Sequence, residues 1–190
     1  MGDGNPSFYY GAAGVIWALD YLHRIGATRV AEDFRPALPK LLERTTANFE
    51  SKSPAGYAKH GSLLFGEMGA ALLAMRLAPS ASLAELVHMR AEANIELPIR
   101  ELMWGMPGSM VAAIHMAEMT QEPRWRELFE KQAARLLADL EETPTGPTLD
   151  TRSLRRQRPV ARARSWLRWQ RRSVVARMGL VDAHAASTGH

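Results

Sequence analysis

The chain has 190 residues, of which 46% are hydrophobic and 23% charged, so it is long enough for one globular domain with a core. It has no cysteine, which excludes disulfides and thiolate metal sites and is compatible with a reducing compartment. No apolar run approaches the roughly 20 residues that span a bilayer, and the N-terminus lacks the pattern of a signal peptide. We therefore expect a cytoplasmic protein without a transmembrane segment.

The net charge of +4 and the pI of about 9.8 conceal two regions of opposite charge. Residues 1–149 hold 14 Lys and Arg against 18 Asp and Glu, whereas residues 150–190 hold 10 Arg against two Asp. The chain is thus a mildly acidic body followed by a basic tail. Such asymmetry is often found in proteins that bind nucleic acid or membranes through a tail.

The spacing of apolar residues predicts six helices, with no strand and no hairpin. Three helices are apolar on nearly every side and are expected to be buried. They cover residues 11–26, 66–80 and 105–119. A more amphipathic helix follows each of them, over residues 39–50, 82–97 and 122–142.

In each apolar helix, apolar residues at i, i+4 and i+7 are expected to face the core. In the last amphipathic helix, one long apolar stripe is expected to do so. Ser82 is the expected N-cap of the helix over 82–97, because Glu85 three residues later completes a capping box. The predicted stripes are Val15, Leu19 and Leu22; Met68, Leu72 and Met75; Met110, Ile114 and Ala117; and Trp125, Leu128, Phe129, Ala133, Leu136, Leu137 and Leu140.

A pair of glycines three residues apart opens each apolar helix, in the segments "GAAG", "GEMG" and "GMPG". Glycine at a helix start allows two backbones to approach closely, and Pro107 suits the first turn of the third helix. Three helical hairpins opened in the same way indicate a repeat array, in which each unit is buried against its neighbours. The glycines are Gly11 and Gly14, Gly66 and Gly69, and Gly105 and Gly108.

With these residues, the chain resembles the lanthionine synthetase C-like (LanC-like) family. The resemblance rests on "YYGAAGVIWALDYL", "HGSLLFGEMGAALLAMRL" and "ELMWGMPGSMVAAIHMAEMT", with Trp104 in the most distinctive segment. It implies an all-α fold in which residues 1–147 form a partial α/α toroid of about three hairpins, against about six or seven in a complete ring. The motif glycines, Trp104 and Pro107 would then line a central cavity, where helix N-termini offer free amides suited to anions.

The family also implies a chemistry that this chain lacks residues to perform. Catalytic members bind one Zn²⁺ through two cysteines and a histidine, and the metal activates a peptide thiol that closes a thioether ring. Because the chain has no cysteine, we expect no metal, no cofactor and no cyclase activity from the chain alone. His60 is either a cavity-facing residue or an ordinary loop residue. His115 is expected in the core, and His23 and His88 on the surface.

The segment from residue 148 to residue 190 is rich in Arg, Ala and Ser and contains no lysine. The favoured interpretation is an out-of-frame or truncated product, since the glycine motif stops inside a connection. A genuine tail of low order is an alternative. So is a basic arm that stacks Trp166 and Trp169 on nucleic-acid bases, or a membrane-surface helix. Binding to nucleic acid is therefore not the expected function.

Three functions remain open at this point. The favoured one is a LanC-like peptide-modification protein that is truncated, lacks the zinc site and tends to self-associate through the unfinished edge of its toroid. The alternative is a non-enzymatic helical module that binds a peptide and carries a cationic tail. A glycosidase would need paired carboxylates, and Glu67 and Glu101 are the candidates, although both fit better as ordinary acids at helix starts.

Overall fold

The structure is a computed structural model in which residues 4–52, 61–143 and 146–149 are described. The chain divides into two compact units, Met1–Asp150 and Thr151–His190. The second unit lies outside the described residues, and with it lie the expectations for the basic tail.

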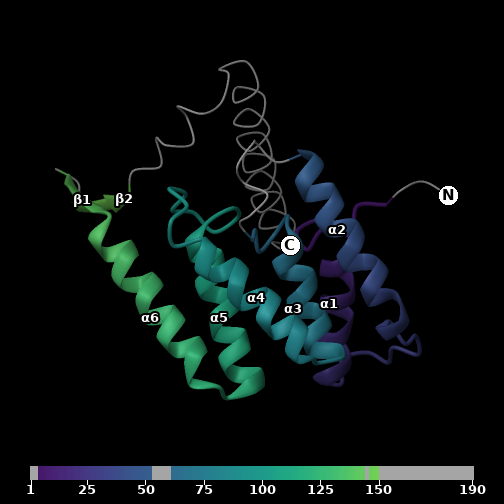
Figure 1. The fold of residues 1–190 in the computed structure, drawn as a ribbon. Helices are drawn as coiled ribbons and strands as arrows, with labels where there is room; N and C mark the ends of the chain where they lie inside the picture. The colour runs from purple at the N-terminus through teal and green to yellow at the C-terminus, as the bar shows by residue number, and fades with distance from the viewer. Residues whose placement is uncertain (1–3, 53–60, 144–145, 150–190) are drawn as a thin grey trace, which may run out of the picture. The chain divides into compact units, whose positions relative to one another are not determined.

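The described part is predominantly helical, which confirms the all-α class, and every predicted helix is present within a few residues of its expected bounds (Figure 1). None of these helices is long and apolar enough to cross a membrane. A 3₁₀ turn at Arg35–Ala37 precedes the second helix. The helices are α1 (Ala12–Arg24), α2 (Leu38–Lys52), α3 (Glu67–Leu77), α4 (Ala81–Ala93), α5 (Met106–Thr120) and α6 (Pro123–Ala138).

A short antiparallel ribbon follows α6, and the prediction of no hairpin was wrong here. Strand β1 (Leu140–Thr143) pairs with β2 (Gly146–Leu149), so that Leu140 lies opposite Leu149. Each strand has only four residues, and "LEET" and "GPTL" lack clear alternation. Hydrophobic periodicity could not identify strands this short.

The three glycine-opened helices pack as one row, and the amphipathic helices pack over it (Figure 1). Helix α3 stands between α1 and α5. Helix α2 packs on α3, α4 packs on both α3 and α5, and α6 packs on α5 and α4. Helices α4 and α6 therefore each contact the apolar helix of their own hairpin, and α4 also contacts the apolar helix of the next hairpin.

The core is centred on α3, in which every residue from Glu67 to Met75 is buried. One hydrophobic cluster joins α3 to α1 and α2, and a second joins α3 to α4, α5 and α6. Trp125 on α6 is fully buried in the second cluster, as its stripe predicted. Leu137 in the last turn of α6 is 67% exposed instead, and the predicted stripe ends before it.

Helix α1 is much less buried than its composition predicted. Val15 is 60% exposed and Leu22 38%, whereas Ala13 and Ile16 form the buried face. Helix α1 is the first helix of the row. Its packing partner there is α3, which covers one side of α1. On α5 the predicted stripe is also wrong in part, since Ile114 is 45% exposed.

The N-cap of α4 is not the serine that the sequence predicted. Helix α4 begins after Ser80, whose hydroxyl accepts a hydrogen bond from the Leu83 amide at 3.3 Å, so the expected cap at Ser82 was wrong by two residues. Ser80 has the extended backbone that an N-cap requires and directly follows the last turn of α3 and its proline. Glu85, the expected partner in a capping box, pairs with Arg124 on α6 at 3.1 Å.

A buried arginine ties the start of the α5 loop to the end of α6. Arg100 is nearly buried, and its Nε lies 2.6 Å from Oδ2 of Asp139. Burial alone would raise the pKa of Asp139, but the hydrogen bond and charge of Arg100, helped by Arg135, outweigh it and hold this pKa below its usual value. The carboxylate is therefore charged at neutral pH and stabilises the folded state.

Candidate functional site

Each of the three apolar helices begins at the first glycine of its motif. Gly11, Gly66 and Gly105 are the N-caps of α1, α3 and α5, and all three have extended backbones. Pro107 lies in the first turn of α5, as predicted. The loops that precede the three helices contact one another and so lie on the same side of the row. We call the segments 5–11, 61–66 and 99–105 the glycine loops, and the surface they form the glycine-loop face.

The second glycine of each motif is required by the loop that precedes it. A Cβ added there would lie 2.0 to 2.4 Å from the carbonyl oxygen of the residue six positions earlier. This holds for Gly14, Gly69 and Gly108. The glycine loop thus crosses directly over the first turn of its own helix, so the close approach is between a loop and its helix, whereas the sequence predicted one between helices.

The same loops occupy helix amides that were expected to be free. The Ala12 amide donates to the carbonyl of Asn5 at 2.9 Å, and the Ala13 amide donates to that of Pro6 at 3.3 Å. In α5 the Met106 amide donates to Ile99 at 3.3 Å. The expectation of open anion-binding ends is therefore wrong for these amides, because loop carbonyls already satisfy them.

Hydrogen bonds join each glycine loop to the next. The Tyr9 amide donates to the Leu64 carbonyl at 2.9 Å, and the Ser62 hydroxyl donates to the Met103 carbonyl. Leu64 and Met103 stand at the same position in their loops, two residues before the first glycine. The first loop is thus bonded to the second and the second to the third, by a backbone amide in one case and a side-chain hydroxyl in the other.

Glu101 holds the third loop and has no open carboxylate. Its Oε2 accepts from the Met103 amide at 2.9 Å, and its Oε1 accepts from the Trp104 amide at 2.6 Å. It lies in the turn before α5, so it is not the helix-entry acid that was expected. Ser62 occupies the equivalent position in the second loop and accepts from the Phe65 amide at 3.0 Å.

An aromatic strip runs along the glycine loops. An aromatic residue directly precedes the first glycine in every loop, and these rings contact one another in order. Tyr10 and Phe65 have centroids 5.7 Å apart, and Phe65 stacks on Trp104 at 4.8 Å with an interplanar angle of 25°. Tyr9 at one end and Phe49 of α2 at the other extend the strip. Tyr10 is 64% exposed, and Phe65 and Trp104 are half-buried.

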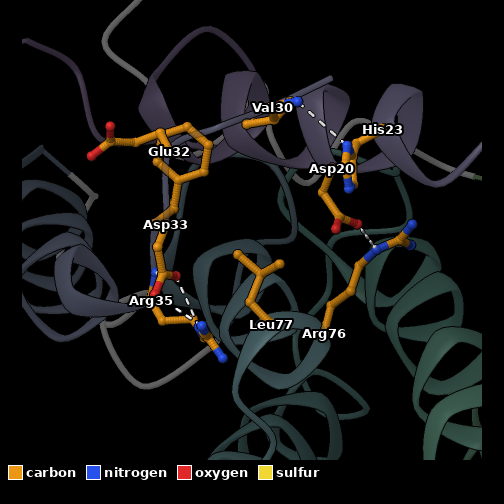
Figure 2. Close-up of a pocket in the computed structure, with 9 residues that line it drawn as sticks. Asp20, His23, Val30, Glu32, Asp33, Arg35, Arg76 and Leu77 are labelled. Carbon is orange, nitrogen blue, oxygen red and sulfur yellow. Dashed lines mark hydrogen bonds and ion pairs between the residues drawn. The ribbon is translucent and has the colours of Figure 1, made fainter. Parts of the chain in front are cut away.

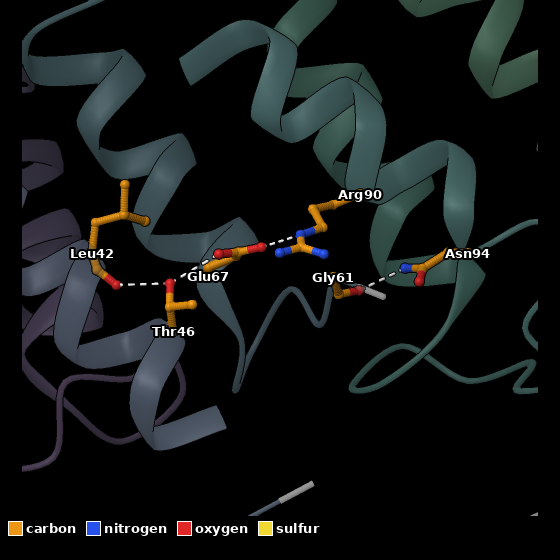
Figure 3. Close-up of polar contacts among 6 residues, drawn as sticks. All are labelled: Leu42, Thr46, Gly61, Glu67, Arg90 and Asn94. Carbon is orange, nitrogen blue, oxygen red and sulfur yellow. Dashed lines mark hydrogen bonds and ion pairs between the residues drawn. The ribbon is translucent and has the colours of Figure 1, made fainter. Parts of the chain in front are cut away.

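Two sets of polar contacts lie at the start of α3 and at the end of α4 (Figure 3). Glu67 in the first turn of α3 pairs with Arg90 of α4, and its Oε2 lies 2.8 Å from the hydroxyl of Thr46 on α2. Asn94 donates from Nδ2 to the Gly61 carbonyl at 2.6 Å and to Ser109 of α5. The first set therefore joins α2, α3 and α4, and the second joins the end of α4 to the second glycine loop and α5.

Neither of the two acids considered for a glycosidase is placed to act as its general acid or nucleophile. Glu67 is a helix-entry acid, as predicted, and its carboxylate is buried against an arginine. Glu101 is occupied by two backbone amides. A general acid and a nucleophile each need a carboxylate that can reach substrate, so these contacts give no support to glycoside hydrolysis.

The histidines are dispersed. His115 is half-exposed and lies edge-on to Trp17, so the expectation of a core residue was wrong. His88 is half-buried against Trp125, whereas His23 is exposed as expected. His60 lies outside the described residues. Within the described ranges, no three His, Asp or Glu side chains are grouped so that they could hold a metal ion.

A second candidate is an open cavity of about 280 Å³ between the end of α1, the segment 30–35 and the end of α3 (Figure 2). Its charges largely satisfy one another. Arg76 pairs with Asp20 at 2.5 Å, and Arg35 pairs with Asp33 at 2.8 Å. The side-chain hydrogen bond from Arg35 lowers the pKa of Asp33. With these groups already paired, the cavity offers less for a ligand than the aromatic strip does.

The chain matches no protein-family model, and comparison with curated proteins and with solved structures found no match.

Proposed function

We propose that this chain is a LanC-like helical scaffold that binds peptides on its glycine-loop face and has no cyclase activity of its own. The observation that carries the proposal is the aromatic strip, in which the residue before the first glycine of all three loops is aromatic. Support for the family comes from the alternation of apolar and amphipathic helices and from glycine-opened helices packed in one row. A partial α/α toroid would have this arrangement.

Peptide binding suits the chemistry of the strip. Aromatic rings bury a large area while few rotatable bonds are fixed, so they bind at a low entropic cost. Tyr10 and Tyr9 leave most of their surface exposed, and Leu102 adds an exposed aliphatic side chain from the third loop. Prolyl and aromatic side chains of an extended peptide would stack on these rings.

We infer the lack of cyclase activity from the missing zinc ligands of the family. A thiol becomes a strong nucleophile near neutral pH when a metal lowers its pKa. The family holds that metal with two thiolates, and this sequence has no cysteine to supply them. Elemental analysis of the purified full chain tests this part, and we expect substoichiometric zinc. One tightly bound zinc per chain would overturn it.

Peptide binding is tested with fluorescently labelled peptides rich in Ser, Thr, Cys and Pro, followed by anisotropy. We expect saturable binding that Tyr10→Ala weakens about fivefold, because stacking on one ring contributes roughly 1 kcal/mol. Met89→Ala is the matched control, since Met89 on α4 is 53% exposed, against 64% for Tyr10, and is not part of the aromatic strip. Equal affinity for both variants, or no binding, would refute the proposal.

The second candidate is a peptide-binding module with no relation to the family, which the same strip would serve. The LanC-like scaffold and the unrelated module predict different coding DNA. Reading the coding DNA beyond codon 148 in all three frames separates them, because a glycine-rich continuation with Cys and His in another frame supports the family. Its absence from every frame favours the unrelated module.

A further inference from the structure

The face of α1 turned away from the core is apolar, which is the reverse of an ordinary surface helix. Val15, Ala18, Leu22 and Ile25 are all exposed and follow the spacing of a helix–helix contact. The charge of Asp20 is directed to α3, where it pairs with Arg76 (Figure 2). A helix whose outer face met only water would carry its charges there.

The repeat shows what these positions do in the other units. Counted from the first glycine of each motif, Val15, Ala18 and Leu22 stand 4, 7 and 11 residues on. The equivalent positions pack against the preceding unit. Ala70 and Leu73 of α3 lie in one cluster with Ala13 and Ile16 of α1, and Ala112 and Met116 of α5 lie in one cluster with Met68, Ala71 and Leu72 of α3.

The other end of the row carries the complementary surface. The residues 2, 5 and 6 positions after the first glycine pack onto the next unit, as Ala13, Ile16 and Trp17 of α1 do onto α3. In α5 the equivalent residues are half-buried, and Ile114 beside them is 45% exposed. They are Pro107, Met110 and Val111.

We propose that a second copy of this chain docks its α5 edge, formed by Pro107, Met110, Val111 and Ile114, on the exposed face of α1. This contact repeats the one that the chain already makes between α1 and α3 and between α3 and α5. Surfaces that pack on each other inside a repeat array are complementary between its two ends as well. The contact is head-to-tail, so it joins two different surfaces. It does not depend on the peptide-binding proposal.

The mass of the full chain in solution tests the contact. Light scattering after size exclusion, at loading concentrations from about 1 to 100 μM, is expected to show a species of at least twice the 21.1 kDa chain mass. Val15→Glu and Ile114→Glu each place a charge on one of the two surfaces and should raise the apparent dissociation constant at least about tenfold. Met89→Glu, at an exposed position of α4, should leave the mass unchanged.

Mixing the two variants shows whether the contact is head-to-tail. Each retains one intact surface, so an equimolar mixture should regain a dimer that neither variant forms alone. If Ile114→Glu associates like the unmodified chain, α1 pairs with α1 and the proposal is overturned. A monomeric unmodified chain also overturns it, and indicates that another part of the same chain covers α1.

Circular dichroism checks that each variant keeps its helices. If Val15→Glu does not, Ala18→Glu replaces it, since Ala18 is exposed on the same face and its own side chain is a single methyl group. The same loss of association is expected from that variant, and unchanged association would overturn the proposal.

Discussion

Replacing Gly69 by alanine tests the geometry of the glycine loops directly. Gly69 is the third residue of α3, and a Cβ there would lie 2.3 Å from the Leu63 carbonyl oxygen and 2.7 Å from Cβ of Phe8. The first of these is a backbone atom in a loop joined to both neighbouring loops. The added methyl group therefore cannot be accommodated by turning a side chain.

Two opposing effects set the size of the change. Alanine has the higher helix propensity and would stabilise α3 by about 1 kcal/mol relative to glycine. Overpacking a filled interior costs about 1 to 3 kcal/mol, and contact with a fixed backbone places Gly69 at or above the upper end of that range. We expect a net loss of about 2 kcal/mol, which lowers the melting temperature of a domain this size by roughly 4 to 8 °C.

Thermal and urea unfolding, followed by circular dichroism at helical wavelengths, measure the change. Gly4→Ala is the control, because a Cβ at Gly4 has no atom within 4 Å. Gly14→Ala and Gly108→Ala meet the same kind of loop carbonyl and should behave like Gly69→Ala. If Gly69→Ala is as stable as the unmodified chain, helix propensity outweighs packing and the loop does not cross α3 as described.

Three further substitutions test other contacts. Glu67→Gln removes the charge that faces the half-buried Arg90, and we expect a loss of about 1 to 3 kcal/mol in the free energy of unfolding by urea titration. Asp139→Asn should cost about 1 to 2 kcal/mol at pH 7. Because the folded-state pKa of Asp139 is lowered, its contribution is present above the unfolded pKa of about 4 and is lost as pH falls through the folded pKa. The difference between the variant and the unmodified chain should therefore shrink in a titration to pH 2, and a constant difference would contradict the role of the ion pair. Ser80→Ala should lower the melting temperature by the equivalent of about 1 kcal/mol, whereas Ser82→Ala should change it little; the reverse order would restore the cap expected from sequence.

The helices could be predicted because apolar spacing and glycine pairs are local signals. Each of the six lies within a few residues of its expected bounds. The cap of α4 was misassigned because "SAS" offers two serines in reach, and backbone conformation decides between them. The four-residue strands carry too few side chains to show a period. These errors arise where several short signals compete and tertiary contacts select one.

The site was only partly predictable. The motif glycines and Trp104 were identified, and the structure places them together on one face. Tyr10 and Phe65 were missed, although an aromatic residue before each first glycine is visible in the sequence. The occupied helix amides could not be foreseen, because they depend on how each loop folds back over its own helix.

The largest disagreement concerns α1, and it is informative. Spacing predicts that Val15 and Leu22 are buried, whereas both are exposed in the structure. A periodic pattern identifies residues suited to burial but does not name the surface that covers them. In α3 the equivalent residues are covered by the preceding unit, and α1 has no preceding unit within the described residues. Docking of a second chain on this face would bury the residues that the pattern predicts to be buried, so sequence and structure would then agree at the level of the assembly.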